Sequence, residues 1–247
     1  MEELIKILKE FNTNRDCHKS DINKKWDEDA VAECFKPCAK EILCNGYFLV
    51  NGRYIIDLGC IELYYNEEGN GKDKIKDPIM YHTNDKKPYS THYKEIGKYP
   101  YFKFGSFNLH QSGIDVTFEN PDKEYRASFL IRSYRVIEKG DNETLENVEY
   151  KLNNLSEPKF DPHSTHIFDD MFPNGIIFGD NKDVKIEWKL YNKCDKNNIG
   201  LTKRINVKEY ENDNGDYKTD CKGNFIKTDT EEKRNWGFKI NGIHEHK

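Results

Sequence analysis

The sequence predicts an α+β fold: a single domain in which N-terminal helices pack on a mostly antiparallel, curved β-sheet. Three observations lead to this prediction. Apolar residues recur at helical spacing near the N-terminus. The dipeptide Asn51-Gly52, a strong hairpin signal, separates two strand-like apolar runs. Most later apolar runs are short, and helices followed by antiparallel strands are typical of the α+β class.

The length of the chain, 247 residues, is enough to bury a substantial core. We expect one domain over residues 1–247, with helices in 1–45, a strand core that carries the site in 46–140, and further strands and loops in 141–247. No apolar run approaches the roughly 20 residues that cross a bilayer, and the first residues lack the basic and apolar regions of a signal peptide. We expect a cytoplasmic protein without membrane contact, and a monomer is the starting hypothesis.

Two helices are predicted at the N-terminus. Apolar residues three and four apart predict the first over residues 2–11, and the polar residues 12–25 are expected to form a loop. Asp27 or Asp29 is the expected cap of the second helix, which continues to about Leu43.

The predicted sheet begins after these helices. Residues 47–50 and 54–65 are expected to form a hairpin around Asn51-Gly52. Gly59, inside the second strand, is a candidate for a β-bulge. The long polar segment 66–100 follows, and loops of this length are usually functional or disordered.

Further strands are predicted along the rest of the chain, with one helix among them. An acidic, helix-prone stretch covers residues 143–155, and residues 206–234 are polar and turn-rich. The remaining strands are expected at 101–107 and 113–119, linked by 108–112, and at 126–138, 176–178, 184–190 and 236–240.

Two of the apolar strands bring polar side chains to one place. Glu62 and Tyr64 are two residues apart, so in a strand they share a face. Arg132 ends an apolar run, where an unpaired charge is costly unless it has a partner or a function. A carboxylate, an aromatic ring and a cation together could hold a planar substrate and activate a water molecule. The alternative is that Glu62 and Tyr64 lie on the solvent side of a strand.

A second polar group alternates with apolar residues in a later strand. Asp115, Thr117 and Glu119 share one strand face. For Thr117 and Glu119 the favoured interpretation is the polar side of a half-buried strand. His110 and Asp115 could instead form a site with Glu62, since two facing carboxylates raise the pKa of one of them.

The net charge of −5 argues against strong nucleic-acid binding, because neutralising phosphates usually requires a basic excess. The charge is unevenly distributed, however. Residues 66–103 hold eight Lys and six acidic residues, whereas residues 138–187 hold twelve acidic residues and five Lys. A basic face could still meet a polyanion, and the acidic region 138–187 could contact a protein partner.

The seven cysteines are odd in number and show no Cys-x-x-Cys spacing. Reduced, partly buried thiols are therefore expected. The cysteines around Cys34 and Cys38 match no familiar zinc pattern, and the pair His163 and His166 lacks a known metal pattern as well. We expect no metal and no other cofactor.

Five short segments occur in an order that is familiar from one enzyme family. They are Ala39–Leu43, Val50–Arg53, Glu62–Tyr64, Asp77–His82 and Leu130–Ser133. The chain thereby resembles the alkyladenine (3-methyladenine) DNA glycosylase family, in which a helix leads into a hairpin, a strand ending Glu-x-Tyr, an Asp-x-x-x-His loop and a Leu-Leu-Arg-Ala strand. The C-terminal segments Lys203–Asn206 and Asn235–Lys239 are similar to that family's Arg-Ile-Gly turn and final aromatic strand.

The resemblance implies a glycosylase-like domain that flips an alkylated or deaminated purine out of double-stranded DNA and hydrolyses its N-glycosidic bond. It assigns Glu62 the role of general base for the attacking water. Tyr64 and His82 would be aromatic walls around the flipped base, and Arg132 would position the water or a phosphate. The family needs no metal, and such a role would place the protein in a nucleus or nucleoid.

The resemblance also suggests further contacts with the base and with DNA. Phe107 is the nearest apolar candidate for the wedge that the family inserts into the base stack, and Asp115 stands where the family has a pocket Asn. Lys203 and Arg204 would hold phosphate, although such a pair most often marks a solvated turn. His82, in a Lys-rich loop, has the alternative interpretation of a surface histidine.

Two other classes of function stay open. The same fold could be a binding or inhibitory module that uses the acidic region 138–187. It could also be an enzyme that acts on a free nucleoside or small nucleotide. Such a substrate would explain why the chain has no strong excess of basic residues and no clear counterpart of the residue that the family inserts into DNA. Binding of duplex DNA would show a steep salt dependence, and binding of a nucleoside would not.

Overall fold

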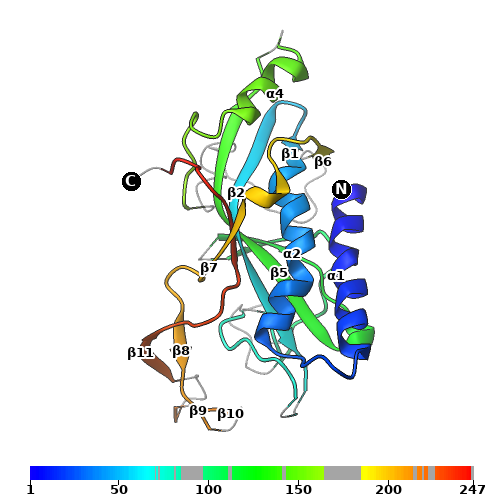
Figure 1. Cartoon of the computed structure of the whole chain (residues 1–247), viewed down its shortest axis with the longest axis vertical. Helices are drawn as coiled ribbons and strands as arrows, with labels where there is room; N and C mark the ends of the chain where they lie inside the picture. The colour runs from blue at the N-terminus through cyan, green and yellow to red at the C-terminus, as the bar shows by residue number, and fades with distance from the viewer. Residues whose placement is uncertain are drawn as a thin grey trace.

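The computed structural model describes residues 1–69, 71, 73–80, 82–84, 97–110, 113–140, 143–163, 185–213, 216–218, 220–221 and 226–245. Only the backbone is described at 109–110, 212–213 and 216–217. The predicted fold class is confirmed: N-terminal helices pack on one face of a curved antiparallel sheet (Figure 1).

Two N-terminal helices, α1 (Glu2–Ser20) and α2 (Glu28–Cys44), lie side by side in Figure 1. Asp27 is the cap of α2, because its side chain accepts a hydrogen bond from the Ala30 N–H at 3.1 Å. The loop predicted for residues 12–25 is wrong as far as Ser20, since α1 continues through it.

A tertiary anchor explains why α1 is longer than its apolar pattern. The buried Arg15 donates to the Tyr65 hydroxyl and to Glu67 Oε1, both at 2.8 Å. Lys19 donates to the same Glu67 oxygen at 2.7 Å. These contacts fasten the last turns of the helix to the sheet, and tertiary contacts of this kind override weak local helix propensity.

The main sheet is built around two long strands, β2 (Tyr54–Glu67) and β5 (Tyr125–Glu138), which pair along their whole length. The strand order is β3-β4-β5-β2-β1-β6, and β12 pairs with β2 and β7. On its other edge, β2 therefore pairs first with β1 and then with β12. The other strands are β1 (Gly46–Val50), β3 (Phe107–His110), β4 (Gly113–Thr117), β6 (Ile186–Leu190), β7 (Ile199–Thr202) and β12 (Gly237–Ile240).

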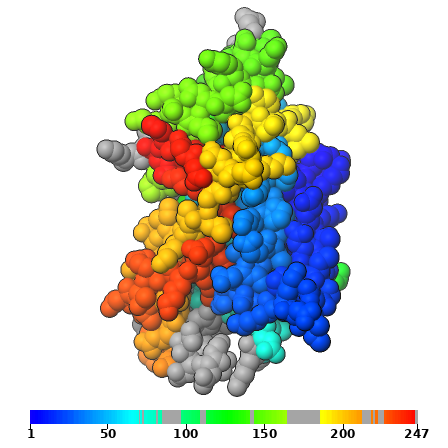
Figure 2. Space-filling view, viewed as in Figure 1, coloured from blue at the N-terminus to red at the C-terminus, as the bar shows by residue number. Residues whose placement is uncertain are grey.

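The smaller elements lie at the two ends of the molecule in Figure 1, with α4 at one end and β8 to β11 at the other. On the face drawn in Figure 2, the chain after β7 (orange to red) lies beside α2 (blue). The elements at the two ends are α4 (Leu145–Asn153) and the strands β8 (Lys208–Tyr210), β9 (Asn212–Asp213), β10 (Asp216–Tyr217) and β11 (Lys227–Glu231). Elsewhere the chain forms two short turns, η1 (Pro121–Lys123) and η2 (Lys196–Asn198).

The strand predictions after residue 100 are partly wrong. Residues 101–106 are not a strand, and β3 takes up residues 108–110 of the expected link. Gly105 has a φ of +73°, and its N–H donates to the Thr117 carbonyl at 2.8 Å, so the chain turns there. The strands β7 to β11 were not expected from the sequence. The predicted strand at 176–178 lies outside the described residues.

The hairpin predicted at Asn51-Gly52 is confirmed. It joins β1 to β2, with Val50 opposite Tyr54. Asn51 and Gly52 have φ values of 51° and 69°. Asn and Gly tolerate this left-handed conformation better than other residues do, which is why the dipeptide is a hairpin signal.

A β-bulge at Gly59 changes which residues of β2 face the helices. The register of β2 with β5 shifts between Leu58 and Ile61, which confirms the predicted bulge. Leu58 and Ile61 both belong to the core under the helices, although regular alternation over three positions would put them on opposite faces. Glu62 and Tyr64 therefore face away from the helices.

The two faces of the sheet consequently differ in character. The face under α1 and α2 is apolar and packs around rings such as Phe11, Phe35 and Phe118. The opposite face of β2, β4 and β5, which we call the polar face, carries polar side chains that are nevertheless buried. Its buried polar residues include Glu62, Asn66, Asp115, Thr117, Arg126 and Ser128.

We predict that Gly59→Ala destabilises the protein by about 1–3 kcal/mol, the usual cost of overpacking a core. A Cβ at Gly59 would lie 2.5 Å from the Phe160 ring and 2.8 Å from Ile243. Gly140→Ala is the control, because its Cβ would meet only Glu143 at 3.7 Å. Urea unfolding of both variants measures the difference. Equal stability of the two would contradict the close packing at the bulge.

A second prediction concerns the anchor of α1. Burial alone would raise the pKa of the Glu67 carboxyl, but hydrogen bonds from Lys19, the Ile75 N–H and Arg15 lower it to about 2. Against the ordinary value of 4.5, this amounts to about 3 kcal/mol of stability at neutral pH. Because the folded-state pKa is depressed, that contribution is present above about pH 4.5 and is lost as the pH falls towards 2.

Glu67→Gln should therefore destabilise the protein strongly at pH 7 and progressively less below pH 4.5. Unfolding curves in urea at several pH values test this. The control is Glu33→Gln, which removes an exposed helix carboxylate that pairs with Lys36. A stability difference for Glu67→Gln that stays constant with pH would show that the carboxylate charge does not hold α1.

Candidate functional site

The candidate site lies on the polar face, where the register aligns side chains from three strands. Tyr64 on β2 lies directly opposite Ser128 on β5. In the next row, Glu62 on β2 and Asp115 on β4 both lie opposite Leu130. Directly opposed residues have Cβ atoms about 5 Å apart. The two rows therefore form one compact patch.

Glu62 is the centre of this patch and is only 1% exposed. Its Oε1 accepts a hydrogen bond from the Ile205 N–H at 2.6 Å and lies 3.4 Å from Arg132 Nε. Its Oε2 accepts from the Tyr64 hydroxyl at 3.2 Å. The structure thus brings together Glu62, Tyr64 and Arg132, as predicted. The alternative of a solvent-facing Glu62 is wrong.

The surroundings shift the titration of both Glu62 and Tyr64. Burial raises the pKa of the Glu62 carboxyl, although the Arg132 charge and the Ile205 N–H oppose this. Burial and then the Glu62 charge raise the pKa of the Tyr64 phenol well above its ordinary value. Tyr64 is consequently a neutral hydrogen-bond donor near pH 7, and the proton affinity of Glu62 is closer to that of an effective general base.

Arg204 lies against the Tyr64 ring and not on the surface. Its guanidinium carbon is 4.7 Å from the centroid of that ring and 5.0 Å from the centroid of Trp236. It donates to Asp77 at 2.6 Å and to Glu232 at 2.8 Å. Burial would lower the pKa of Arg204, but the Asp77 and Glu232 carboxylates raise it well above its ordinary value.

This arrangement corrects the expectation for Lys203 and Arg204. The solvated-turn interpretation is wrong for Arg204, which is 3% exposed, and its donors bind protein carboxylates. A DNA phosphate would have to displace one of them. Lys203 is exposed.

Phe107 is not placed as a wedge. Its ring packs edge-on against Phe48 of β1, with centroids 5.3 Å apart. In register it lies opposite Val116, a fully buried core residue, so it belongs to the apolar face of the sheet. The expected insertion of Phe107 between DNA bases would require it to leave that face.

His82 is buried, so the surface interpretation is wrong for it. Its Nε2 lies 2.8 Å from Glu119 Oε1, and its ring packs edge-on against Phe102 at 5.5 Å between centroids. Glu119 in turn binds Arg126 at 3.2 Å. Arg126, the partner of Glu119, is four residues along β5 from Leu130, which is the residue opposite Glu62. At about 3.3 Å per residue this separation is roughly 13 Å. The contacts described for Tyr64 and Glu62 do not include His82.

The structure aligns Asp115 with Glu62 in register, but for His110 it describes only the backbone. Asp115 is 3% exposed, and its negative charge is one of the smaller causes of the raised pKa of the Tyr64 phenol. The backbone of His110 lies opposite Gly113 in the β3–β4 hairpin. The His110 side chain lies outside the described part of the chain.

Sequence reasoning missed four residues of the site. Ile205 donates its backbone N–H to Glu62, and Asp77 and Glu232 hold the guanidinium of Arg204. These residues come from loops whose approach to the site depends on long-range packing. Ser128 could have been found by alternation, because it is a small polar residue inside an apolar strand, two positions from Leu130.

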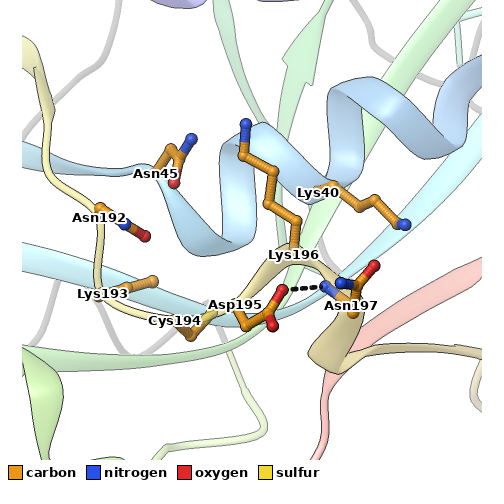
Figure 3. A pocket seen from close by; sticks show the side chains of 8 residues that line it. All are labelled: Lys40, Asn45, Asn192, Lys193, Cys194, Asp195, Lys196 and Asn197. Carbon is orange, nitrogen blue, oxygen red and sulfur yellow. Dashed lines mark hydrogen bonds between the residues drawn. The ribbon is translucent and has the colours of Figure 1, made fainter.

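Two cysteines differ from the expected reduced state, because Cys44 and Cys194 form a disulfide. The bridge joins the end of α2 to the segment after β6, at the hollow drawn in Figure 3. Lys193, next to the bridge, is buried and pairs with Asp57 on β2. The hollow is lined by Lys40, Asn45, Asn192, Lys193, Cys194, Asp195, Lys196 and Asn197 (Figure 3).

Within the described ranges, no helix is long and apolar enough to cross a bilayer. The same residues contain no cluster of three or more His, Cys, Asp or Glu arranged to hold a metal ion. His166, from the pair considered above, lies outside them.

Comparisons with protein families, with curated proteins and with solved structures give no match. The chemistry of the site is therefore argued from its own residues.

The raised pKa of Glu62 predicts a pH-dependent cost to the fold. A carboxyl with a raised folded-state pKa destabilises the folded protein once it ionises, so stability is lost as the pH rises through that pKa. Glu62→Gln cannot ionise. Its unfolding free energy, relative to that of the wild type, should increase between pH 4 and pH 8 by about 1.4 kcal/mol for each unit of pKa shift.

Urea unfolding of both proteins across this pH range tests the prediction. Glu138→Gln is the control, because Glu138 lies on β5, is half exposed, and pairs with Arg53 at the surface. If the stability of Glu62→Gln relative to the wild type fell as the pH rises, the ionised carboxylate would stabilise the fold. Burial would then not be the largest influence on the pKa of Glu62.

Proposed function

We propose that this protein hydrolyses the N-glycosidic bond of an altered purine in DNA, with Glu62 as the general base. The observation that carries the proposal is the meeting of Glu62, Tyr64 and Arg132 on one buried face of the sheet. An ionisable acid, a cation and an aromatic ring are the groups that this hydrolysis requires. A role in DNA repair implies a nuclear or nucleoid location.

In the proposed reaction, Glu62 takes a proton from a water molecule, and the water oxygen attacks C1′ of the sugar. The bond from C1′ to the purine nitrogen breaks, and the base leaves with the electron pair. A carboxylate has about four acceptor positions. The hydrogen bonds from Ile205 and Tyr64 occupy two of them, so Glu62 keeps the capacity to bind the water.

The other residues have supporting roles. Arg132, 3.4 Å from Glu62, balances the carboxylate charge and can position the water or a phosphate. Arg204 covers one face of the Tyr64 ring, which would leave the opposite face for stacking of the purine. The side chain of Arg132 is 14% exposed and Tyr64 is only partly buried, so solvent reaches the site at these two residues.

A second candidate, hydrolysis of a free nucleoside or small nucleotide, is favoured by a separate observation. Phe107 packs against Phe48 and Arg204 binds two carboxylates, so two of the three residues expected to contact DNA have partners within the protein. The net charge of −5 points the same way. The same glutamate would carry out the same bond cleavage on the smaller substrate.

We predict that Glu62→Gln lowers the rate of base release by at least about a hundredfold, the usual contribution of a general base. Substrates are duplexes carrying hypoxanthine or 7-methylguanine, and inosine as the free nucleoside, each at low and moderate salt. Glu138→Gln, which changes an exposed carboxylate on the same pair of strands, should keep wild-type activity.

The outcomes separate the candidate functions. Release from duplex that falls steeply with salt supports the DNA enzyme, and release from inosine alone supports the nucleoside enzyme. Equal rates for the wild type and Glu62→Gln would refute the role of Glu62. Absence of release and of binding with every substrate would favour a binding module, for which the acidic region 138–187 is the first surface to examine.

A further inference from the structure

The two cysteines of the disulfide are unequally exposed. Cys44, the last residue of α2, is fully buried, whereas Cys194 is partly exposed and lines the hollow of about 910 Å³ in Figure 3. A hollow of this size admits a small molecule, because ligand sites usually measure about 300–1,000 Å³. Exposed disulfides are also opened by thiols more easily than buried ones. A small thiol can therefore reach Cys194 but not Cys44.

The lining of the hollow is polar and indicates the kind of thiol that fits it. Its eight residues are three Asn, three Lys, one Asp and Cys194. Lys193 and Lys196 are each paired with an acidic residue, whereas Lys40 has no acidic partner among the described residues. Amide and ammonium groups form hydrogen bonds with peptide groups and carboxylates. A peptide thiol of the glutathione class therefore fits this lining better than an apolar thiol.

The segment after β6 is held in place by bonds that do not involve sulfur. The Lys193 N–H donates to the Cys44 carbonyl at 2.8 Å, and the Tyr191 N–H donates to the Asn45 carbonyl at 3.1 Å. The Lys193 ammonium also donates to the Leu58 carbonyl at 2.9 Å. We therefore expect the fold to remain when the disulfide opens.

The surroundings of Cys44 also suit its reduced form. The Cys44 Sγ lies 3.5 Å from the Asp195 carbonyl oxygen, within reach of a hydrogen bond from a thiol. A thiol is a weak donor, and this carbonyl would accept its proton once the disulfide has opened. The reduced, buried Cys44 would therefore keep a hydrogen-bond partner.

The other five cysteines are free thiols, and three of them are unreactive. Burial raises the pKa of the Cys34 thiol to about 11 and the pKa values of Cys38 and Cys60 to about 12. These thiols stay protonated at neutral pH, and only a thiolate attacks a disulfide. Cys17 and Cys221 are exposed and provide an internal reference for reactivity.

We propose that the Cys44–Cys194 disulfide is a redox-sensitive site, which a peptide thiol of the glutathione class opens in the folded protein. The incoming thiolate attacks the Cys194 Sγ and forms a mixed disulfide there. Cys44 leaves with the electron pair of the S–S bond and takes a proton from solvent. A second peptide thiol then attacks the peptide sulfur of the mixed disulfide. Cys194 is released as a thiol, and the two peptide thiols are oxidised to their disulfide.

This inference goes beyond the proposed function and does not depend on it, because it rests on the disulfide and the hollow alone. Its test counts the thiols of the folded protein before and after incubation with reduced glutathione at neutral pH. The reaction is quenched with acid, the protein is unfolded and alkylated, and intact mass gives the count.

We expect five alkylated thiols before incubation, because five cysteines are free. After incubation we expect all seven cysteines to be alkylated, or Cys194 to carry a glutathione. Seven alkylated thiols before incubation would show that the disulfide does not form and would overturn the proposal. Five thiols after incubation would overturn it as well.

Measurements in urea below the unfolding transition distinguish direct attack from attack after unfolding. Direct attack through the hollow predicts a rate of disulfide opening that does not change with urea over this range. Unfolding accelerates as the urea concentration rises. An opening rate that increases in parallel with the unfolding rate would show that the disulfide is only a structural link, and it would overturn the proposal.

Two single variants identify the sulfur that is attacked. Oxidised glutathione should form a mixed disulfide with Cys194 in Cys44→Ala, because Cys194 lines the hollow. Formation at Cys44 should be lost in Cys194→Ala, because Cys44 is fully buried. Peptide mapping locates the adducts, with Cys17 and Cys221 as references. Equal modification of Cys44 and Cys194 would overturn the assignment of the attacked sulfur.

The unpaired ammonium of Lys40 tests the class of thiol. Lys40→Gln should slow opening by glutathione about two- to fivefold, the effect of one charge pair in water, and should not slow opening by the cationic thiol cysteamine. Lys6→Gln, which changes an exposed lysine on α1, is the control and should leave both rates unchanged. An unchanged rate with glutathione in Lys40→Gln would overturn the preference for an anionic peptide thiol.

Discussion

The pairing of β2 with β5, interrupted by the bulge at Gly59, is the constraint on which the rest of the structure depends. It turns Glu62 away from the helices and keeps Ile61 under them. Without the extra residue, alternation would exchange the two, placing a carboxylate in the apolar core. Phe160 packs so closely over Gly59 that a larger residue does not fit there. One backbone irregularity thus makes both the core and the site possible.

The polar face that results is costly to bury, and the chain offsets this cost with ion pairs. Arg204 binds Asp77 and Glu232 beside the Tyr64 ring, and Arg132 lies 3.4 Å from Glu62. Ion pairs of this kind often do not stabilise a protein more than apolar residues of similar size would. The buried charges of this face are therefore weak evidence for added stability, and removing one partner of a pair would cost more than the pair contributes.

Much of the fold and the centre of the site can be predicted from local sequence. Asn51-Gly52 and Gly59 are local backbone signals, and alternation is enough to place Glu62 beside Tyr64. The contacts of Arg204 could not be predicted in this way, because its partner Asp77 is 127 residues distant in the chain. The same is true of the disulfide, which joins cysteines 150 residues apart, and spacing alone does not determine such pairing. Local pattern identifies strand faces, but the loops that cover them follow from packing.

Glu62 is a buried carboxyl whose titration is controlled by burial and by Arg132. A carbon-13 NMR titration of the Glu62 carboxyl, in the wild type and in Arg132→Gln, tests it most directly. We predict a midpoint above the ordinary 4.5 in the wild type and a higher one in the variant, because the Arg132 charge opposes the effect of burial. A midpoint near 4.5 that does not move when Arg132 is replaced would contradict it.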